Sequence, residues 1–138
     1  MILLVDADSL IFSSAFADTL EIAKNSFDRK LTEIVNHLED FYEIEEVRVF
    51  SGSLGNFRNI LTNKYKANRK ASARPELLSE LHNLIKFDYN SIFEYGVETD
   101  DVVAKHWFNE CKLVGRDNVM IVSIDKDYKQ FPCLMYNY

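Results

Sequence analysis

The chain has 138 residues, of which 47% are hydrophobic and 28% charged, and its formal net charge is −6. This length and composition suit a single globular domain with a real core and exclude a disordered or fibrous chain. Apolar runs fall short of the roughly 20 residues that a membrane helix needs, and the amino terminus lacks the features of a secretory signal. With only two cysteines, Cys111 and Cys133, we expect reduced thiols and a cytoplasmic protein.

Short apolar runs alternate with amphipathic segments along the first half of the chain. Residues 2–5 form a continuous apolar run, which predicts a buried parallel strand that ends at Asp6. Ser9 is expected to cap a helix over residues 10–20. Apolar residues at spacings of three and four predict a second helix over residues 31–42, and residues 47–50 predict a second strand.

The second half continues the alternation after a turn at residues 51–56. Pro75 suits the first turn of a helix whose apolar positions continue to Ile85. Residues 91–95, 119–123 and 134–136 predict three more strands, and a helix from Glu98 to Leu113 is expected to break at Gly115. Because strands alternate with helices, we predict an α/β fold: a mostly parallel sheet of about five strands with helices on both faces, in one domain over residues 1–138.

Acidic residues gather at the ends of these elements. Glu98, Asp100 and Asp101 open a predicted helix, Asp125 and Asp127 follow a predicted strand, and Asp6 and Asp8 follow the first strand. The carboxyl ends of parallel strands form one functional edge, where gathered carboxylates repel one another unless a cation neutralises them. Mg²⁺ or Mn²⁺ is the simplest such cation. The alternative for residues 98–101 is an ordinary helix start, where each acid contributes roughly 0.3–1 kcal/mol.

Basic residues concentrate between residues 57 and 74, a segment that holds no acid. Its six members are Arg58, Lys64, Lys66, Arg69, Lys70 and Arg74, and the rest of the chain carries 10 basic and 22 acidic residues. On a helix, Lys66, Arg69 and Lys70 would share one face and meet successive phosphates, and Tyr65 would stack on a base or sugar. A solvated basic helix is the alternative. This asymmetry suits an anionic polymer held by one element while metal ions offset the acids at another.

Five stretches, in this order, resemble the 5′–3′ exonuclease and flap endonuclease family, especially its bacteriophage exonucleases. They read VDAD (5–8), NFR (56–58), YKANRK (65–70), GVETDD (96–101) and VSIDKDYK (122–129). The resemblance implies a PIN-like (resolvase-like) three-layer fold and divalent-metal hydrolysis of DNA, or of the RNA in RNA–DNA hybrids, at a 5′ end or flap. It also implies a role in DNA replication or degradation, in the cytoplasm of a bacterium or a phage-infected host.

The resemblance further assigns roles to single residues. Metal-ligand positions of the family match Asp6, Glu98, Asp100, Asp101, Asp125 and Asp127. Lys66 and Arg69 match the basic residues that hold the scissile phosphate, and Arg58, Lys64, Tyr65 and Lys70 are expected to contact nucleic acid. Asp8 falls where many relatives have a small polar residue. It would either join the acidic site or cap the following helix. The implied mechanism uses two ions roughly 3.5–4 Å apart, one that activates water and one that stabilises the leaving oxygen.

The chain departs from the family pattern at two places. The family has an aspartate just after the second strand, where this chain reads FSGS (50–53). The family also continues past the fifth strand, with a helix-hairpin-helix element that binds duplex and with further aspartates, whereas this chain stops at Tyr138. We therefore expect a fragment, a split enzyme completed by a separate chain, or a reduced member with weak or lost activity.

Two other functions stay open. Asp6, Asp8 and Ser51 resemble the nucleophile, the acid/base and the phosphate-binding hydroxyl of haloacid-dehalogenase-type phosphatases, but that assignment leaves residues 65–70 and 98–101 unexplained. A non-catalytic nucleic-acid-binding module would keep the fold and bind DNA through Lys66 and Arg69, without metal-dependent cleavage.

Overall fold

The computed structural model describes residues 1–52 and 75–138 of the chain. Within them, the strands β1 (Ile2–Asp6), β2 (Glu46–Phe50), β3 (Val119–Val122) and β4 (Leu134–Tyr136) form one sheet. The sheet has the order β2-β1-β3-β4, and every neighbouring pair is parallel. The helices are α1 (Asp8–Ser14), α2 (Leu20–Glu39), α5 (Leu78–Tyr89) and α6 (Thr99–Val114), with short 3₁₀ helices at Arg116–Asn118 and Lys126–Gln130.

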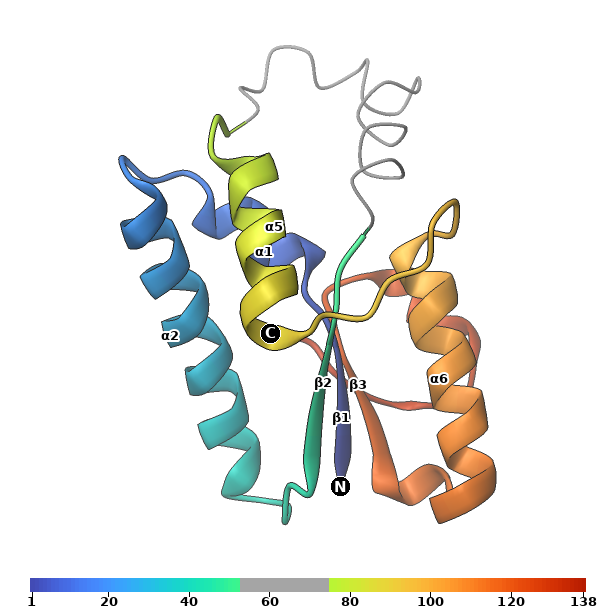
Figure 1. Ribbon diagram of the computed structural model, residues 1–138. Coiled ribbons are helices and arrows are strands. Elements are labelled where there is room, and N and C mark those ends of the chain that lie inside the picture. The colour runs from blue at the N-terminus through green and yellow to red at the C-terminus, as the bar shows by residue number, and fades with distance from the viewer. Residues whose placement is uncertain (53–74) are drawn as a thin grey trace.

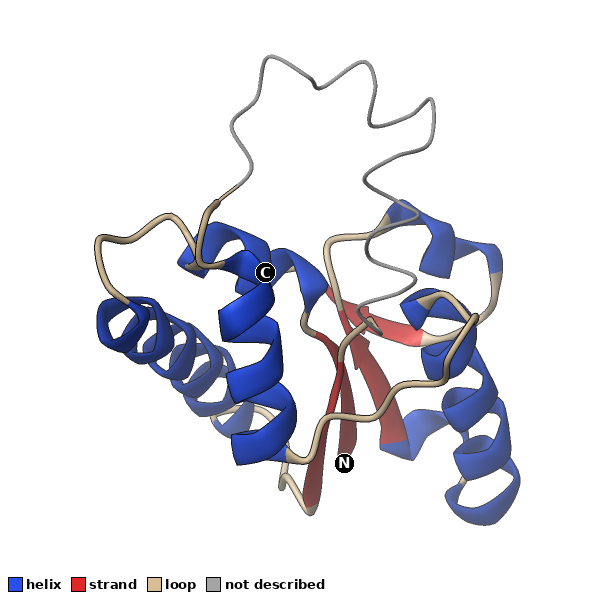
Figure 2. Cartoon of the chain, turned by 45° about the horizontal axis from the view of Figure 1, so that its top comes forward, coloured by secondary structure: helices blue, strands red, loops and turns tan. Residues whose placement is uncertain are grey.

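Helices cover both faces of the sheet. The helices α1, α2 and α5 lie on one side of the strands and α6 lies on the other (Figure 1; Figure 2). Side chains alternate between the two faces along each strand, so Leu3 packs in a core with Phe27 while Leu4 packs in the other core with Trp107. This confirms the predicted three-layer α/β arrangement.

The strands end together at what we call the carboxyl edge of the sheet. Asp6 pairs with Phe50, and Val5 pairs with Val122, so β1, β2 and β3 reach this edge in register. The opposite end of the strands is the amino edge. Because all strands are parallel, the residues that follow β1, β2 and β3 are brought to one place.

The predicted strand over residues 91–95 is wrong. This segment makes an isolated bridge between Ile92 and Phe50, in which the Ile92 N–H donates to the Val49 carbonyl at 2.8 Å. The pairing stops because the chain turns at once, where the Val97 N–H donates to the Glu94 carbonyl at 3.2 Å. The described part of the sheet therefore has four strands, not about five.

The predicted helix over residues 10–20 is two helices. α1 starts at Asp8, with Ala7 in the N-cap position that was expected for Ser9, and it ends at Ser14. Leu20 opens α2, because the Thr19 side chain accepts a hydrogen bond from the Ile22 N–H at 3.2 Å and so caps a new helix. Phe16, which was expected in the first helix, lies between the two and is 56% exposed.

The remaining helices differ from prediction only at their ends. α2 stops at Glu39, so Phe41 and Tyr42 lie beyond it. α5 begins at Leu78, after a turn in which the Leu78 N–H donates to the Pro75 carbonyl. α6 ends at Val114 with Gly115 (φ 90°) as its C-cap, as expected for a glycine break. None of the helices in the described ranges is long and apolar enough to cross a membrane.

Candidate metal centre

Asp6 is the last residue of the central strand β1 and is nearly buried, at 8% exposure. Its Oδ2 accepts a hydrogen bond from the Tyr128 hydroxyl at 2.8 Å, and its Oδ1 accepts a longer one from the Asp8 N–H at 3.4 Å. Burial, followed by the negative charge of Asp8, raises the pKa of Asp6 to about 8, although both hydrogen bonds oppose this shift. A buried carboxyl of this kind gains most from a cation placed beside it.

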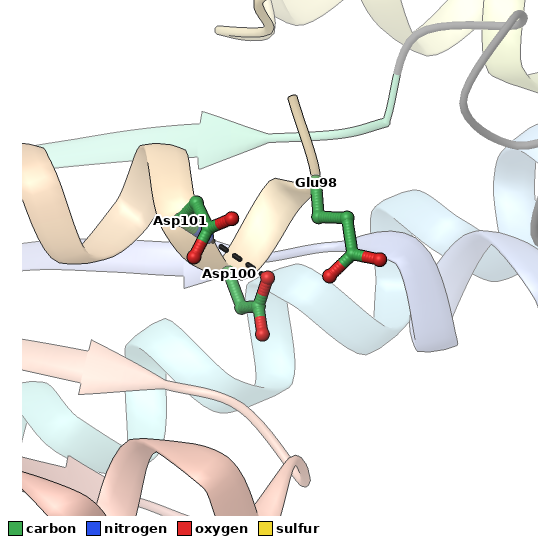
Figure 3. Close-up of side chains that lie close together, drawn as sticks. All are labelled: Glu98, Asp100 and Asp101. Atoms are coloured by element: carbon green, nitrogen blue, oxygen red, sulfur yellow. Dashed lines mark hydrogen bonds between the residues drawn. The ribbon is translucent and has the colours of Figure 1, made fainter. Parts of the chain in front are cut away.

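The first turn of α6 supplies three more carboxylates. Glu98 is the N-cap residue, with extended backbone (φ −67°, ψ 150°), and Asp100 and Asp101 follow in the first turn. One carboxylate oxygen from each lies within 4.8 Å of the others. Figure 3 shows the three side chains at the start of the helix. The Asp101 N–H donates to Asp100 Oδ1 at 2.9 Å. The helix dipole favours acids here, but it does not require three of them to converge.

Asp100 belongs to a second carboxylate group as well. Its carboxylate oxygens come within 4.8 Å of those of Asp125 and Asp127, which follow β3. Asp125 is fixed in place, because its N–H donates to Ser123 Oγ at 3.0 Å and its Oδ1 accepts from the Asp127 N–H at 2.9 Å. Burial comes first among the causes that raise the pKa of Asp100, and the charges of Asp101 and Glu98 come next. Asp100 therefore joins two acidic groups that lie far apart in sequence.

A small hollow lies against this junction. Its volume is about 160 Å³, and Asp100, Asp101, Asp127 and Tyr128 are among its lining residues. That is room for a few water molecules, each of which takes about 30 Å³ in the liquid. The ligand atoms of the two carboxylate groups are all carboxylate oxygens. Such oxygens suit a hard cation such as Mg²⁺ or Mn²⁺ and do not suit a soft one.

Five of the six predicted metal ligands thus fall into two groups, and Asp6 stands apart from both. Glu98, Asp100 and Asp101 form one group, and Asp100, Asp125 and Asp127 form the other. Asp6 belongs to neither group among the described residues, but the negative charge of Asp125 contributes to its raised pKa. In the described part of the chain, no ion pair involves any of these six carboxylates.

Asp8 has a role that the sequence did not indicate. It does not cap α1, whose N-cap has no side-chain hydrogen bond. Instead, its Oδ1 accepts from the Gly52 N–H at 2.8 Å, and its Oδ2 accepts from the Thr99 hydroxyl at 2.6 Å. Asp8 therefore ties the residues after β1 to those after β2 and to the first residue of α6, which is next to Asp100. Only the tertiary structure could reveal these bonds, because their partners lie 44 and 91 residues away.

The side chain of Lys86, in α5, contacts the residues that follow β2, where the resemblance to the family leads one to expect an aspartate. Its Nζ donates to Ser51 Oγ at 3.1 Å and to the Gly52 carbonyl at 2.5 Å. Ser51 Oγ is also within hydrogen-bond distance of Ser91 Oγ, at 2.7 Å. Burial lowers the pKa of Lys86, and the nearby charge of Asp8 opposes this. The residues that directly follow β2, Ser51 and Gly52, therefore contribute no carboxylate, and a cationic side chain from α5 binds them.

The predicted nucleic-acid contacts fall outside the described residues. They are Arg58, Lys64, Tyr65, Lys66, Arg69 and Lys70. The chain on either side of this segment is described: Gly52 is held by Asp8 and Lys86 at the carboxyl edge, and Pro75 precedes α5.

Comparison with known proteins gives one family. The family described as "5'-3' exonuclease, N-terminal resolvase-like domain" matches residues 1–133. No curated protein and no solved structure matches the chain. The match spans the elements from β1 through α6 and β3 to the 3₁₀ helix at Lys126–Gln130, and it ends just before β4. The chain belongs to the family of N-terminal resolvase-like domains of 5′–3′ exonucleases.

Proposed function

We propose that this nuclease domain is a divalent-metal-dependent 5′–3′ exonuclease or flap endonuclease that hydrolyses phosphodiester bonds by a two-metal mechanism. The observation that carries the proposal is the position of Asp100, which belongs to two carboxylate groups. Within each group, the ligand oxygens lie within 4.8 Å of one another. Two groups of oxygen ligands that share a carboxylate suit a pair of hard cations bound side by side. The substrate would be DNA with a 5′ end or flap, or the RNA of an RNA–DNA hybrid.

Each residue has a defined task in this proposal. Glu98, Asp100 and Asp101 would hold one Mg²⁺ or Mn²⁺ ion, Asp100, Asp125 and Asp127 would hold the other, and Asp6 would complete the site beside them. When bound, such ions activate water and stabilise the leaving oxygen. The Tyr128 hydroxyl fixes Asp6 by its 2.8 Å hydrogen bond. Lys66 and Arg69 would offset the charge that develops on the phosphate.

Cleavage assays with one matched pair of variants test the proposal. The purified chain is incubated with a 5′-labelled flap and with a nicked duplex, in Mg²⁺ and then in Mn²⁺. Asp100→Asn should lower the cleavage rate at least a hundredfold, because it removes the carboxylate that both groups share. Asp117→Asn is the control, since Asp117 is exposed and precedes β3 at the amino edge. An Asp100→Asn variant that cuts as fast as the unaltered chain would show that the site is assigned wrongly.

A non-catalytic or split nucleic-acid-binding module is the second candidate. Ser51 and Gly52, with Lys86 bound to them, stand where the family places a carboxylate, and this favours weaker ion binding. This candidate predicts salt-sensitive DNA binding through Lys66 and Arg69 with no cleavage in either ion, unless a separate chain completes the site. The phosphatase alternative is disfavoured, because both Asp8 oxygens are already engaged by Gly52 and Thr99 and are not positioned as an acid/base.

A further inference from the structure

A sharp turn between α5 and α6 carries an exposed aromatic side chain three residues before the acidic start of α6. The Val97 N–H donates to the Glu94 carbonyl at 3.2 Å, and Gly96 has φ 76°, so Tyr95 lies in the outer part of this turn. Figure 1 shows the connection reaching past the start of α6 before the helix begins. Tyr95 is 82% exposed. Glu98 follows three residues later, so their Cα atoms are at most about 11 Å apart.

The Tyr95 ring packs against a neighbouring ring, although most of its side chain is exposed. It contacts Phe93 edge-to-face, with ring centroids 5.5 Å apart and an interplanar angle of 85°. Lys86 Nζ lies 4.6 Å from the centroid of the Phe93 ring and also holds Gly52. A line of contacts therefore runs from the end of β2 to Tyr95. A ring that is positioned in advance loses less conformational freedom when it binds a ligand.

The negative charge around this turn favours contact with the base of a nucleotide over contact with its phosphate. Glu94 is paired with Lys105 at 3.3 Å, and the acids of residues 98–101 follow directly. Such surroundings repel a phosphate but do not disfavour a neutral base. An aromatic face stacks on any base, with little preference for sequence.

We propose that Tyr95 stacks on an unpaired base of the nucleic-acid strand that enters the carboxylate site. The inference rests on the proposed function and adds to it a contact for a base, beside the phosphate contacts predicted for residues 58–70. A base inside a duplex already stacks on its neighbours, so Tyr95 selects a single-stranded or frayed segment next to the site.

Binding of a short single-stranded DNA oligonucleotide in the presence of Ca²⁺, followed by fluorescence anisotropy, tests the inference. Tyr95→Ala should weaken binding roughly tenfold, because one stacking contact is lost. Tyr95→Phe should bind as the unaltered chain does, since it keeps the ring. Phe41→Ala is the matched control: Phe41 is 69% exposed and follows α2 at the amino edge, so its loss should not change binding.

An oligonucleotide with a single abasic site, moved along the strand, identifies the base concerned. At one position the abasic site should weaken binding to the unaltered chain but not to Tyr95→Ala. If Tyr95→Ala binds as tightly as the unaltered chain, or Tyr95→Phe is as weak as Tyr95→Ala, the stacking role is wrong while cleavage in the flap assay still supports the nuclease. If the unaltered chain neither binds the oligonucleotide nor cleaves the flap, both proposals fail.

Discussion

At Asp6, burial and neighbouring negative charge act in the same direction on one carboxyl group. The side chain is 8% exposed, and burial together with the negative charge of Asp8 raises its pKa to about 8. Asp100 is shifted in the same direction for the same reasons. Residues of this kind carry an electrostatic cost in the folded state that a bound cation would remove.

The Asp6 shift predicts how stability depends on pH in the absence of metal. The folded pKa is raised from an ordinary value of 3.8 to about 8, so between these values the folded chain holds a proton that the unfolded chain has lost. Stability should therefore fall as pH rises from about 4 to about 8 and then level off. Asp6→Asn removes this dependence, and its melting temperature should exceed that of the unaltered chain by several degrees at pH 8 and by little at pH 4.

Thermal unfolding in EDTA across this pH range is the measurement. Asp117→Asn is again the control, because Asp117 is exposed and precedes β3 at the amino edge, and this variant should follow the unaltered chain at each pH. A difference between Asp6→Asn and the unaltered chain that stays constant with pH would contradict the assignment of a raised pKa to Asp6.

At the scale of elements, the position of α6 decides whether the site forms. Its first turn carries three of the six carboxylates, yet the helix could slide along the sheet if only its apolar residues held it. Thr99 fixes its start, because its hydroxyl donates to Asp8 and the same carboxylate accepts from Gly52 after β2. The packing is close, since a Cβ added at Gly52 would lie 3.3 Å from Thr99 Oγ1 and 3.4 Å from Asp8 Oδ2.

Thr99→Val tests this role of Thr99. Valine has nearly the shape of threonine, so the packing is kept, but Asp8 loses one donor in a half-buried place. The free energy of unfolding in urea should fall by roughly 1–3 kcal/mol. Thr99→Ser keeps the hydroxyl and should lose less. Equal stability of Thr99→Val and the unaltered chain would mean that the Asp8–Thr99 hydrogen bond does not hold α6 in place.

At the scale of the whole molecule, opposite charges are separated along the chain. Two carboxylate groups form at the carboxyl edge, while residues 57–74 carry six basic residues and no acid. A net charge of −6 would repel nucleic acid if it were spread evenly. We expect the six basic residues of this segment to offset that repulsion at the place where nucleic acid would bind.

The salt dependence of binding reports this separation. Each phosphate contact on a duplex contributes roughly 0.9 to the slope of log K against log salt. A double substitution, Lys66→Ala with Arg69→Ala, should therefore reduce the slope for a flap substrate by about 2. Lys112→Ala with Arg116→Ala is the control, because both residues lie near the end of α6 at the amino edge. Equal slopes for the two double variants would exclude Lys66 and Arg69 as phosphate contacts.

Local patterns in the sequence were sufficient for some elements and not for others. The apolar run before Asp6 and the acids before Val102 each predict an element whose type the structure confirms, since burial on both faces or on one stripe is written in the residues themselves. The helix predicted over residues 10–20 failed because Thr19 caps a new helix, and the strand predicted at 91–95 failed because the chain turns after a single bridge. In both cases a hydrogen bond outweighed the apolar pattern.

By itself, the sequence determined the α/β class, the family and the acids available for a site, because periodicity, order of motifs and residue chemistry are local properties. The tertiary structure decided which acids meet. In the folded chain, Asp100 belongs to two carboxylate groups, and Asp8 links the residues after β1 and β2 to α6. The Lys86 side chain binds Gly52 just after β2. These outcomes depend on contacts between residues tens of positions apart, and parallel packing of the strands is what brings such residues to one edge.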